Sequence, residues 1–418
     1  MTTTPPTSSP AASGATPLIH WTEGGEARSA LWRSERGAPP PKRVVLADDT
    51  LAADTAYRLA CEGTGLLWRG DFQNARLLLQ AMVRRVDKPA KPKRDKRHKA
   101  ASQGGSAVTM PPAPTPSVPA AEAFHLHRQA QSQRARVLGM VLLPFEADYG
   151  IPLRRAPDAR KACAEAWGPE DAAAGPSVAS LRELMGLISA HEWRRKGVEI
   201  PALGEPPGNR IHPYYGVFSP VRGEYIDLVA QAPLPAARGP QVAFDIGTGT
   251  GVLAAVLARR GLPRVVATDQ DPRALACARN NLTRLQLLAQ VELLEADLFP
   301  EGRASLIVCN PPWLPARPGS PIERAVYDEG SRMLLGFLKG LAAHLAPGGE
   351  GWLILSDLAE HLGLRSRAEL LAAIDGAGLQ VVGRLDARPQ HPKATDASDP
   401  LHAARALEVT SLWRLAAV

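Results

Sequence analysis

Cysteine is scarce and scattered in this sequence. The four cysteines, Cys61, Cys163, Cys277 and Cys309, lie far apart and form no C-x-x-C pair. Neither the spacing of paired metal ligands nor the cysteine density of a disulfide scaffold is present. We therefore expect no metal site, no disulfide framework and a reducing, cytoplasmic environment.

Long apolar runs are also missing. The best run, "VLGMVLLPF" (137–145), is far shorter than a membrane span requires. The first residues, "MTTTPPTSSPAASGATP", contain neither a basic segment nor an apolar one, as a secretory signal would. We expect no membrane association.

The net positive charge comes from one segment, and the rest of the chain is neutral overall. Residues 84–99, "RRVDKPAKPKRDKRHK", hold nine Lys or Arg and two Asp, so their net charge of +7 equals that of the whole chain. Such a proline-broken run cannot bury apolar surface. It is either a contact to the phosphate backbone of RNA or a ribosome, or a solvated linker, and composition does not decide between them.

The length of 418 residues and the clustering of the 39 prolines predict several domains joined by linker. In the N-terminal half we expect a strand at 42–49 and helices at 51–61, 71–86, 124–142, 157–167 and 177–196, the last capped by Ser177. The predicted organisation is a disordered tail (1–16), a small α/β module (17–86), a basic, Pro-rich linker (87–120), a mainly helical substrate-binding region (121–209) and a catalytic domain (210–418).

Strands and helices alternate strictly after Gly239. We expect strands at 242–246, 264–269, 291–297, 304–309, 351–357, 379–386 and 407–415, and helices at 251–260, 272–287, 325–346 and 366–378. This alternation predicts an α/β fold with a doubly wound, mostly parallel seven-stranded sheet. Only a loop, 388–405, joins the last two strands, so they should pair antiparallel at one edge, and this loop is a candidate for shaping a substrate cleft.

The first of these strands ends in "DIGTGTG". Gly247, Gly249 and Gly251 allow the backbone to approach a ligand closely, with helix N–H groups facing it. The spacing is not the G-x-G-x-x-G of dinucleotide sites. Asp245 at the strand end would repel a pyrophosphate but would pair with a cationic amino acid group.

Carboxylates also end the next two strands. Asp269 is placed to accept both hydroxyls of a ribose, whereas Asp271 is better placed to cap the helix that starts at Pro272. At the end of the third strand, Asp297 is a candidate to accept the amino group of adenine, with Leu298 packing near the ring. A solvated loop carboxylate is the alternative for Asp297.

The fourth strand delivers "NPPW" (310–313) to the same edge of the sheet. With these motifs the chain resembles, over about 210–418, class I S-adenosylmethionine-dependent methyltransferases that methylate planar nitrogens. The resemblance implies a Rossmann-like fold and S-adenosyl-L-methionine as cofactor. It implies cofactor contacts by Asp245, Gly247, Thr248, Gly249, Gly251, Asp269, Gln270, Asp297, Leu298 and Asn310, and a catalytic motif of Asn310, Pro311, Pro312 and Trp313.

The chemistry of a planar nitrogen explains the residue types of this motif. The nitrogen lone pair is delocalised, and acceptance of both N–H hydrogens by the Asn310 side-chain oxygen and the Pro311 carbonyl would favour a pyramidal, nucleophilic nitrogen. The prolines fix the backbone, and Trp313 offers a face to a planar group. No metal is needed for such a transfer.

The substrate is expected to be a macromolecule, with ribosome association as one option. The segment "YYGVFSPVRGEYIDLVAQA" (214–232) is similar to the entrance segment of release-factor and ribosomal-protein glutamine methyltransferases, which favours a protein glutamine. That family usually has Tyr where this chain has Trp313, and it has no counterpart of 17–120. An RNA or DNA adenine-N6 methyltransferase is the alternative, and a catalytically silent cofactor-binding scaffold is an alternative of another class.

Overall fold

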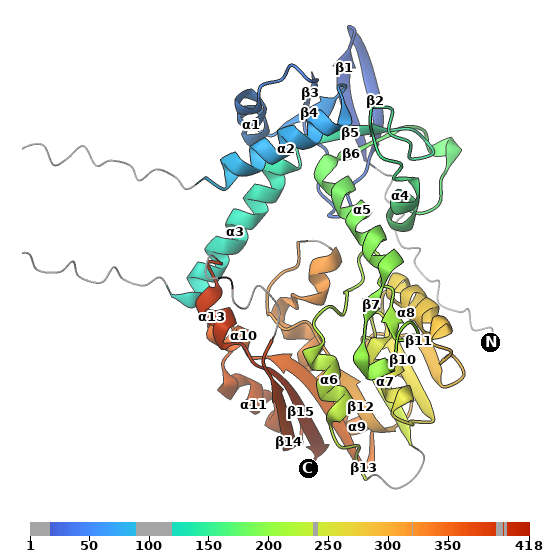
Figure 1. Ribbon diagram of the computed structural model, residues 1–418. Helices are drawn as coiled ribbons and strands as arrows, with labels where there is room; N and C mark the ends of the chain where they lie inside the picture. Colours follow the sequence, from blue (N-terminus) through green and yellow to red (C-terminus); the bar gives the residue numbers. More distant parts are fainter. Residues whose placement is uncertain (1–16, 89–118, 237–240, 320, 390–395, 397–398) are drawn as a thin grey trace, which may run out of the picture. The chain divides into compact units, whose positions relative to one another are not determined.

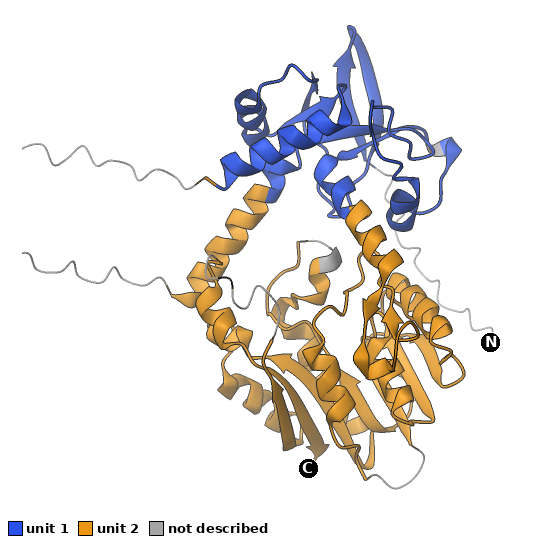
Figure 2. Ribbon diagram, viewed as in Figure 1, with its two compact units in different colours: residues 1–87, 135–186 blue, residues 88–134, 187–418 orange. Residues whose placement is uncertain are grey.

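The structure is a computed structural model that describes residues 17–88, 119–236, 241–319, 321–389, 396 and 399–418. The chain divides into two compact units, residues 1–87 with 135–186 and residues 88–134 with 187–418 (Figure 2). The predicted tail, 1–16, and most of the predicted linker, 89–118, lie outside the described residues. None of the described helices combines the length and apolar character needed to cross a membrane.

A six-stranded mixed sheet forms the centre of the first unit, in the order β1-β2-β6-β5-β4-β3 (Figure 1). β1 and β2 are an antiparallel hairpin, and its turn residues Gly24 and Gly25 have φ of 61° and 85°. Glycine adopts this left-handed conformation without steric cost. The strands are β1 (Leu18–Glu23), β2 (Glu26–Trp32), β3 (Arg43–Ala47), β4 (Thr64–Trp68), β5 (Val141–Phe145) and β6 (Ser177–Ser180).

Two helices of this unit follow the sequence-based expectation, α1 (Ala53–Cys61) and α2 (Phe72–Val86). Asp71 caps α2, because its side chain accepts the Gln73 N–H at 2.8 Å. The buried Asp71 carboxylate also pairs with Arg155 at 2.7 Å, which lowers the pKa of Asp71 to about 2. Asp71 therefore both caps the start of α2 and forms an ion pair with Arg155.

The segment 121–209 contains the three expected helices, and it also contributes two strands to the sheet of the first unit, which were not predicted from the sequence. It contains helices α3 (Ala120–Leu138), α4 (Arg160–Trp167) and α5 (Leu181–Lys196), but also β5 and β6, which pair within the first unit's sheet. Pairing with strands distant in sequence is invisible to local periodicity. Ser177 starts β6 and does not cap α5; the Ser180 hydroxyl accepts the Glu183 N–H at 3.0 Å instead.

The second unit contains the expected seven-stranded sheet, in the order β11-β10-β9-β12-β13-β15-β14. Its first five strands in this order are parallel, and β15 is antiparallel to both β13 and β14, as predicted for the edge. The strands are β9 (Val242–Ile246), β10 (Arg264–Asp269), β11 (Val291–Glu295), β12 (Ala304–Cys309), β13 (Leu345–Ser356), β14 (Leu379–Ala387) and β15 (Thr410–Ala417).

Helices cover both faces of this sheet (Figure 1). Ala243 of β9 faces a core shared with α6 and α7, whereas its neighbour Phe244 faces a second core shared with α9 and α11. Burial on both faces explains why the central strands are continuous apolar runs. The helices of the unit are α6 (Glu224–Gln231), α7 (Val252–Arg259), α8 (Pro272–Arg284), α9 (Arg332–His344), α10 (Leu358–His361), α11 (Arg367–Gly376) and α13 (His402–Leu407).

Several element boundaries in this unit differ from expectation, and α13 begins within the segment 388–405 that was expected to be a loop. β13 begins at Leu345, earlier than predicted, and α9 begins at Arg332, later than predicted. The Asp328 carboxylate accepts the N–H groups of Met333 and Leu334, which fixes the helix start. Short elements complete the structure: β7 (Val198–Glu199), β8 (Arg210–Ile211) and the 3-10 turns η1 (Ala172–Ala174), η2 (Pro201–Leu203), η3 (Pro321–Ala325) and η4 (Glu329–Ser331).

Candidate active site

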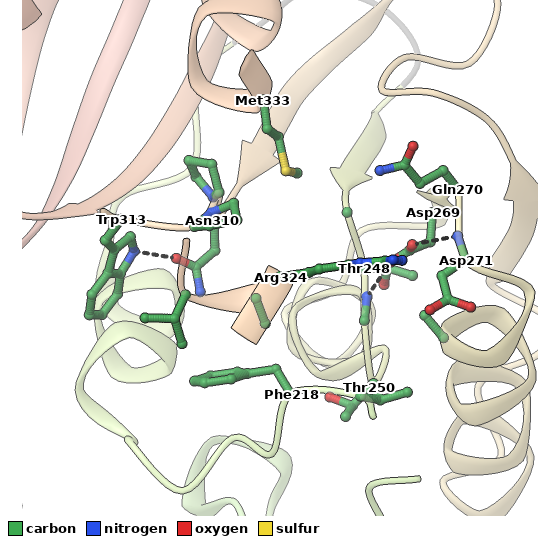
Figure 3. A pocket seen from close by; sticks show the side chains of 18 of the residues that line it. Phe218, Thr248, Thr250, Asp269, Gln270, Asp271, Asn310, Trp313, Arg324 and Met333 are labelled. Carbon is green, nitrogen blue, oxygen red and sulfur yellow. Dashed lines mark hydrogen bonds between the residues drawn. The ribbon is translucent and has the colours of Figure 1, made fainter. Parts of the chain in front are cut away.

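A cavity of about 770 Å³ lies within the second unit, where β9, β10 and β12 end (Figure 3). Open α/β sheets bind ligands at this edge. The predicted site residues that line the cavity are Asp245, Gly247, Thr248, Gly249, Asp269, Gln270, Asp297, Leu298, Asn310, Pro311, Pro312 and Trp313. The structure therefore brings together almost all of the side chains that the sequence singled out.

Gly251 is the exception, because it does not line the cavity. Its φ is 80°, and a Cβ there would lie 3.1 Å from the Ala278 Cβ of α8. Gly251 thus lets α7 approach α8 closely, and its assignment as a cofactor contact stays a prediction. Gly249, by contrast, has φ of 54°, and a Cβ there would have no atom within 4 Å. The space beside Gly249 that a side chain would occupy is therefore empty.

Asp245 connects the glycine turn to α7. Its Oδ2 accepts the Thr248 hydroxyl at 2.6 Å and the Ala254 N–H at 3.0 Å. The residue is buried, and burial raises the pKa of Asp245 to about 6. A buried carboxylate at the edge of a cavity is suited to a cationic ligand group, which would compensate its charge.

Asp269 holds two backbone segments together. Its Oδ2 accepts the Gly249 N–H, and its Oδ1 accepts the Asp271 N–H, both at 3.0 Å. Burial raises the pKa of this carboxyl as well. Asp271 caps α8 through the Arg273 N–H at 2.8 Å, as predicted, whereas the ribose-binding role of Asp269 stays a prediction.

The end of β11 contributes Asp297 and Leu298. The Asp297 carboxylate pairs with Arg332 at 3.2 Å, and both side chains are well exposed. Leu298 has φ of 76°, and its carbonyl accepts the Thr268 hydroxyl at 2.6 Å. The Arg332 pair was not foreseen, because no local signal links a helix start to a strand end so distant in sequence.

Asn310 and Trp313 are bonded to each other at the end of β12. The Trp313 Nε1–H donates to the Asn310 Oδ1 at 2.9 Å (Figure 3). Trp313 also packs against both cores of the sheet. The expected amide acceptor is therefore present at the cavity and already has one partner.

Sequence reasoning missed several lining residues that carry no motif of their own. Phe218 and Arg222 come from the segment flagged as an entrance, and Met333 comes from the start of α9. Arg405 lines the cavity from the flagged loop 388–405, of which 390–395 and 397–398 lie outside the described residues. Further lining residues are Arg324 and Tyr327. Among the described residues, no group of three or more His, Cys, Asp or Glu is arranged to hold a metal ion.

Part of this unit is similar to known methyltransferases. The sequence model described as "Methyltransferase small domain" matches residues 210–366. The ribosomal protein L11 methyltransferase of Pelotomaculum thermopropionicum is 35% identical over 143 residues, 34% of this chain and 39% of that protein. The release factor glutamine methyltransferase of Cereibacter sphaeroides is 33% identical over 167 residues, 34% of this chain and 59% of that protein.

A solved structure, the ribosomal protein L11 methylase of Lactobacillus delbrueckii subsp. bulgaricus, matches 50% of this chain and 84% of its own with 18% identity and a TM-score of 0.34. The chain spans less than two thirds of the length of the curated relatives named above. The second unit contains a class I S-adenosylmethionine-dependent methyltransferase domain with a Rossmann-like fold. Within this domain, residues 210–366 are the ones that match the methyltransferase small domain model.

The residues present fit S-adenosylmethionine, the cofactor of this family. The Asp245 carboxylate is suited to the ammonium group of the cofactor, and Asp269 to its ribose hydroxyls. The open space beside Gly249 leaves room for the cofactor between these two carboxylates. The cofactor supplies an electrophilic methyl group, so the remaining cavity residues must present the acceptor.

Proposed function

We propose that this chain transfers a methyl group to a planar nitrogen of a macromolecule, specifically a side-chain amide of glutamine in a release factor or ribosomal protein. The observation that carries the proposal is the placement of Asn310, Pro311 and Trp313 at the same cavity as Asp245 and Asp269. The names of the two relatives support a protein substrate. The cytoplasmic location expected from the sequence is part of the same proposal.

The chain's own residues would act by orientation and hydrogen bonding. The Asn310 Oδ1 has a second lone pair besides the one that Trp313 occupies, and the Pro311 carbonyl lies next to it in the chain. Acceptance of both amide hydrogens would turn the nitrogen lone pair out of conjugation. These two bonds strengthen as positive charge develops on the nitrogen, so they stabilise the transition state more than the ground state.

A second candidate is an adenine of RNA as the methyl acceptor. Four aromatic residues, Phe218, Tyr225, Trp313 and Tyr327, line the cavity, and aromatic faces stack on bases without sequence preference. The basic segment 84–99 would favour the same partner, but all of it beyond Lys88 lies outside the described residues. The name of one relative, release factor glutamine methyltransferase, favours the amide instead.

A fractionation experiment distinguishes these candidates. Purified protein is incubated with a tritiated methyl donor and a lysate of cells that lack the gene, and the products are treated with nuclease or protease. The Asn310→Ala variant is the matched control. Protease-sensitive, nuclease-resistant counts that the variant does not produce support a protein amide. Counts lost to nuclease assign an RNA base, and cofactor binding without any transfer indicates a catalytically silent scaffold.

A further inference from the structure

Trp313 does more than line the cavity with its ring. Its Nε1–H donates to the side-chain oxygen of Asn310, the proposed catalytic residue, at 2.9 Å. An indole N–H only donates, so the atom of Asn310 that faces it must be the oxygen and not the nitrogen. An asparagine without such a partner can turn its amide by half a rotation and present two donors in place of two lone pairs. Trp313 therefore determines the orientation of the Asn310 amide, with the oxygen toward the indole N–H and the nitrogen away from it.

The Trp313 ring also contacts Arg222, which is in turn connected through Glu408 to the end of β13. The Arg222 guanidinium lies 5.8 Å from the centre of the ring, in a cation–π arrangement. Arg222 pairs with Glu408 at 3.3 Å, and the Glu408 side chain is fully buried. Glu408 also accepts the Ser356 hydroxyl at 2.8 Å, at the end of β13. A continuous set of contacts thus connects the rigid sheet to the Asn310 amide.

We propose that Trp313 is a positioning residue that keeps the Asn310 oxygen turned toward the methyl acceptor, with Arg222 and Glu408 holding the indole ring in place. The inference rests on the proposed function, because it concerns the same nitrogen acceptor. It assigns a role to a position where the glutamine methyltransferases that this chain resembles usually have tyrosine. A phenylalanine would keep the ring face but would lose the N–H that sets the orientation of the amide.

A double-mutant experiment separates this role from simple packing. Trp313→Phe should lower kcat roughly tenfold, with little change in KM for the methyl donor, because one orienting hydrogen bond is lost. In an Asn310→Asp background the two oxygens are equivalent, so either can accept and no orientation is needed. Trp313→Phe should then lower kcat less than twofold. An equal loss in both backgrounds would mean that Trp313 only packs, and the proposal would be wrong.

A second measurement does not depend on activity. The chain has eight tryptophans, so its indole N–H groups labelled with nitrogen-15 give few signals in an NMR spectrum of the whole protein. Trp313→Phe identifies the Trp313 signal by its loss. Asn310→Ala should move that signal upfield and accelerate its exchange with solvent, because the hydrogen bond is lost. Glu408→Gln should shift it as well.

Trp21→Phe is the matched control, since Trp21 donates to Glu23 at 2.9 Å in the first unit. It should remove a different signal and leave the Trp313 signal and turnover unchanged. A Trp313 signal unaffected by Asn310→Ala would overturn the proposal whether or not any variant transfers methyl groups. If methyl transfer is absent from every variant while the signal shifts, the proposed function fails and the hydrogen bond stands.

Discussion

At the scale of single residues, the buried Asp245 carboxylate predicts how the stability of the protein and its cofactor affinity depend on pH. Burial raises its pKa to about 6, so the folded protein binds a proton there more tightly than the unfolded chain. Without cofactor, this group's contribution to stability is therefore greatest at low pH and is lost as pH rises through about 6. The cofactor ammonium needs the charged form, so cofactor affinity should change in the opposite direction.

Asp245→Asn tests this account. Without cofactor at pH 7.5 the variant should be more stable than the wild type by on the order of 2 kcal/mol, since it has no charge to bury. Its cofactor affinity should be weak and nearly independent of pH, whereas that of the wild type should increase between pH 5 and 7. Thermal unfolding and calorimetry measure the two effects, and a wild-type affinity that is flat over this range would refute the role.

Asp269 supports a separate prediction, because both of its oxygens hold backbone N–H groups of the cavity wall. Asp269→Ala should weaken cofactor binding at least tenfold, through loss of the ribose acceptor and of the Gly249 contact. Asp271→Ala is the control at a neighbouring residue that also lines the cavity: it removes the α8 cap and should cost about 1 kcal/mol of stability with a smaller effect on affinity. Equal cofactor affinities of wild type and Asp269→Ala in calorimetry would exclude Asp269 from the site.

At the scale of elements, the glycine turn between β9 and α7 contains two glycines with different tasks. Gly249 and Gly251 both have positive φ, so alanine at either should cost roughly 1–2 kcal/mol. Alanine at Gly251 would also meet the Ala278 Cβ and Cα of α8, at 3.1 and 3.2 Å. Thermal unfolding without cofactor should show a larger loss for Gly251→Ala than for Gly249→Ala, and the reverse order would contradict the packing role.

The elements also show what local sequence can and cannot reveal. "VAFDI" (242–246) and "ASLIVC" (304–309) are buried on both sides, so their apolar runs predicted β9 and β12 correctly. The hairpin β1–β2 was missed, because "EARSALW" is mostly exposed and has a weak pattern. The acids at strand ends and "NPPW" located the cavity, whereas Arg222, Met333 and Arg405 reach it only through tertiary packing.

At the scale of the whole molecule, the first unit is discontinuous in sequence. β5 pairs with β4 on one side and with β6 on the other, although residues 89–118 separate β4 from β5. A sequence-based boundary near residue 120 therefore cuts through one sheet. No composition shift reveals this, because strand pairing depends on partners far away along the chain.

Removal of residues 1–88 tests the discontinuous sheet. The truncated chain would retain β5, "VLLPF", as a buried apolar strand without β4, and bare edges of this kind promote aggregation. We expect it to aggregate at concentrations where the full chain remains dispersed. Removal of only residues 1–16 is the control and should have little effect. A truncated chain that stays monomeric, with the full chain's helix and strand content less the missing segment, would contradict the assignment.

The central claim is that Asn310 accepts a hydrogen bond from the nitrogen that is methylated. The most direct measurement compares Asn310→Ala with the wild type for cofactor affinity by calorimetry and for methyl transfer in the tritium assay. The account predicts an affinity within a few-fold of wild type and a turnover lower by about 10²–10³. Unchanged turnover would contradict the claim, and a parallel loss of cofactor affinity would show that Asn310 serves the cofactor and not the acceptor.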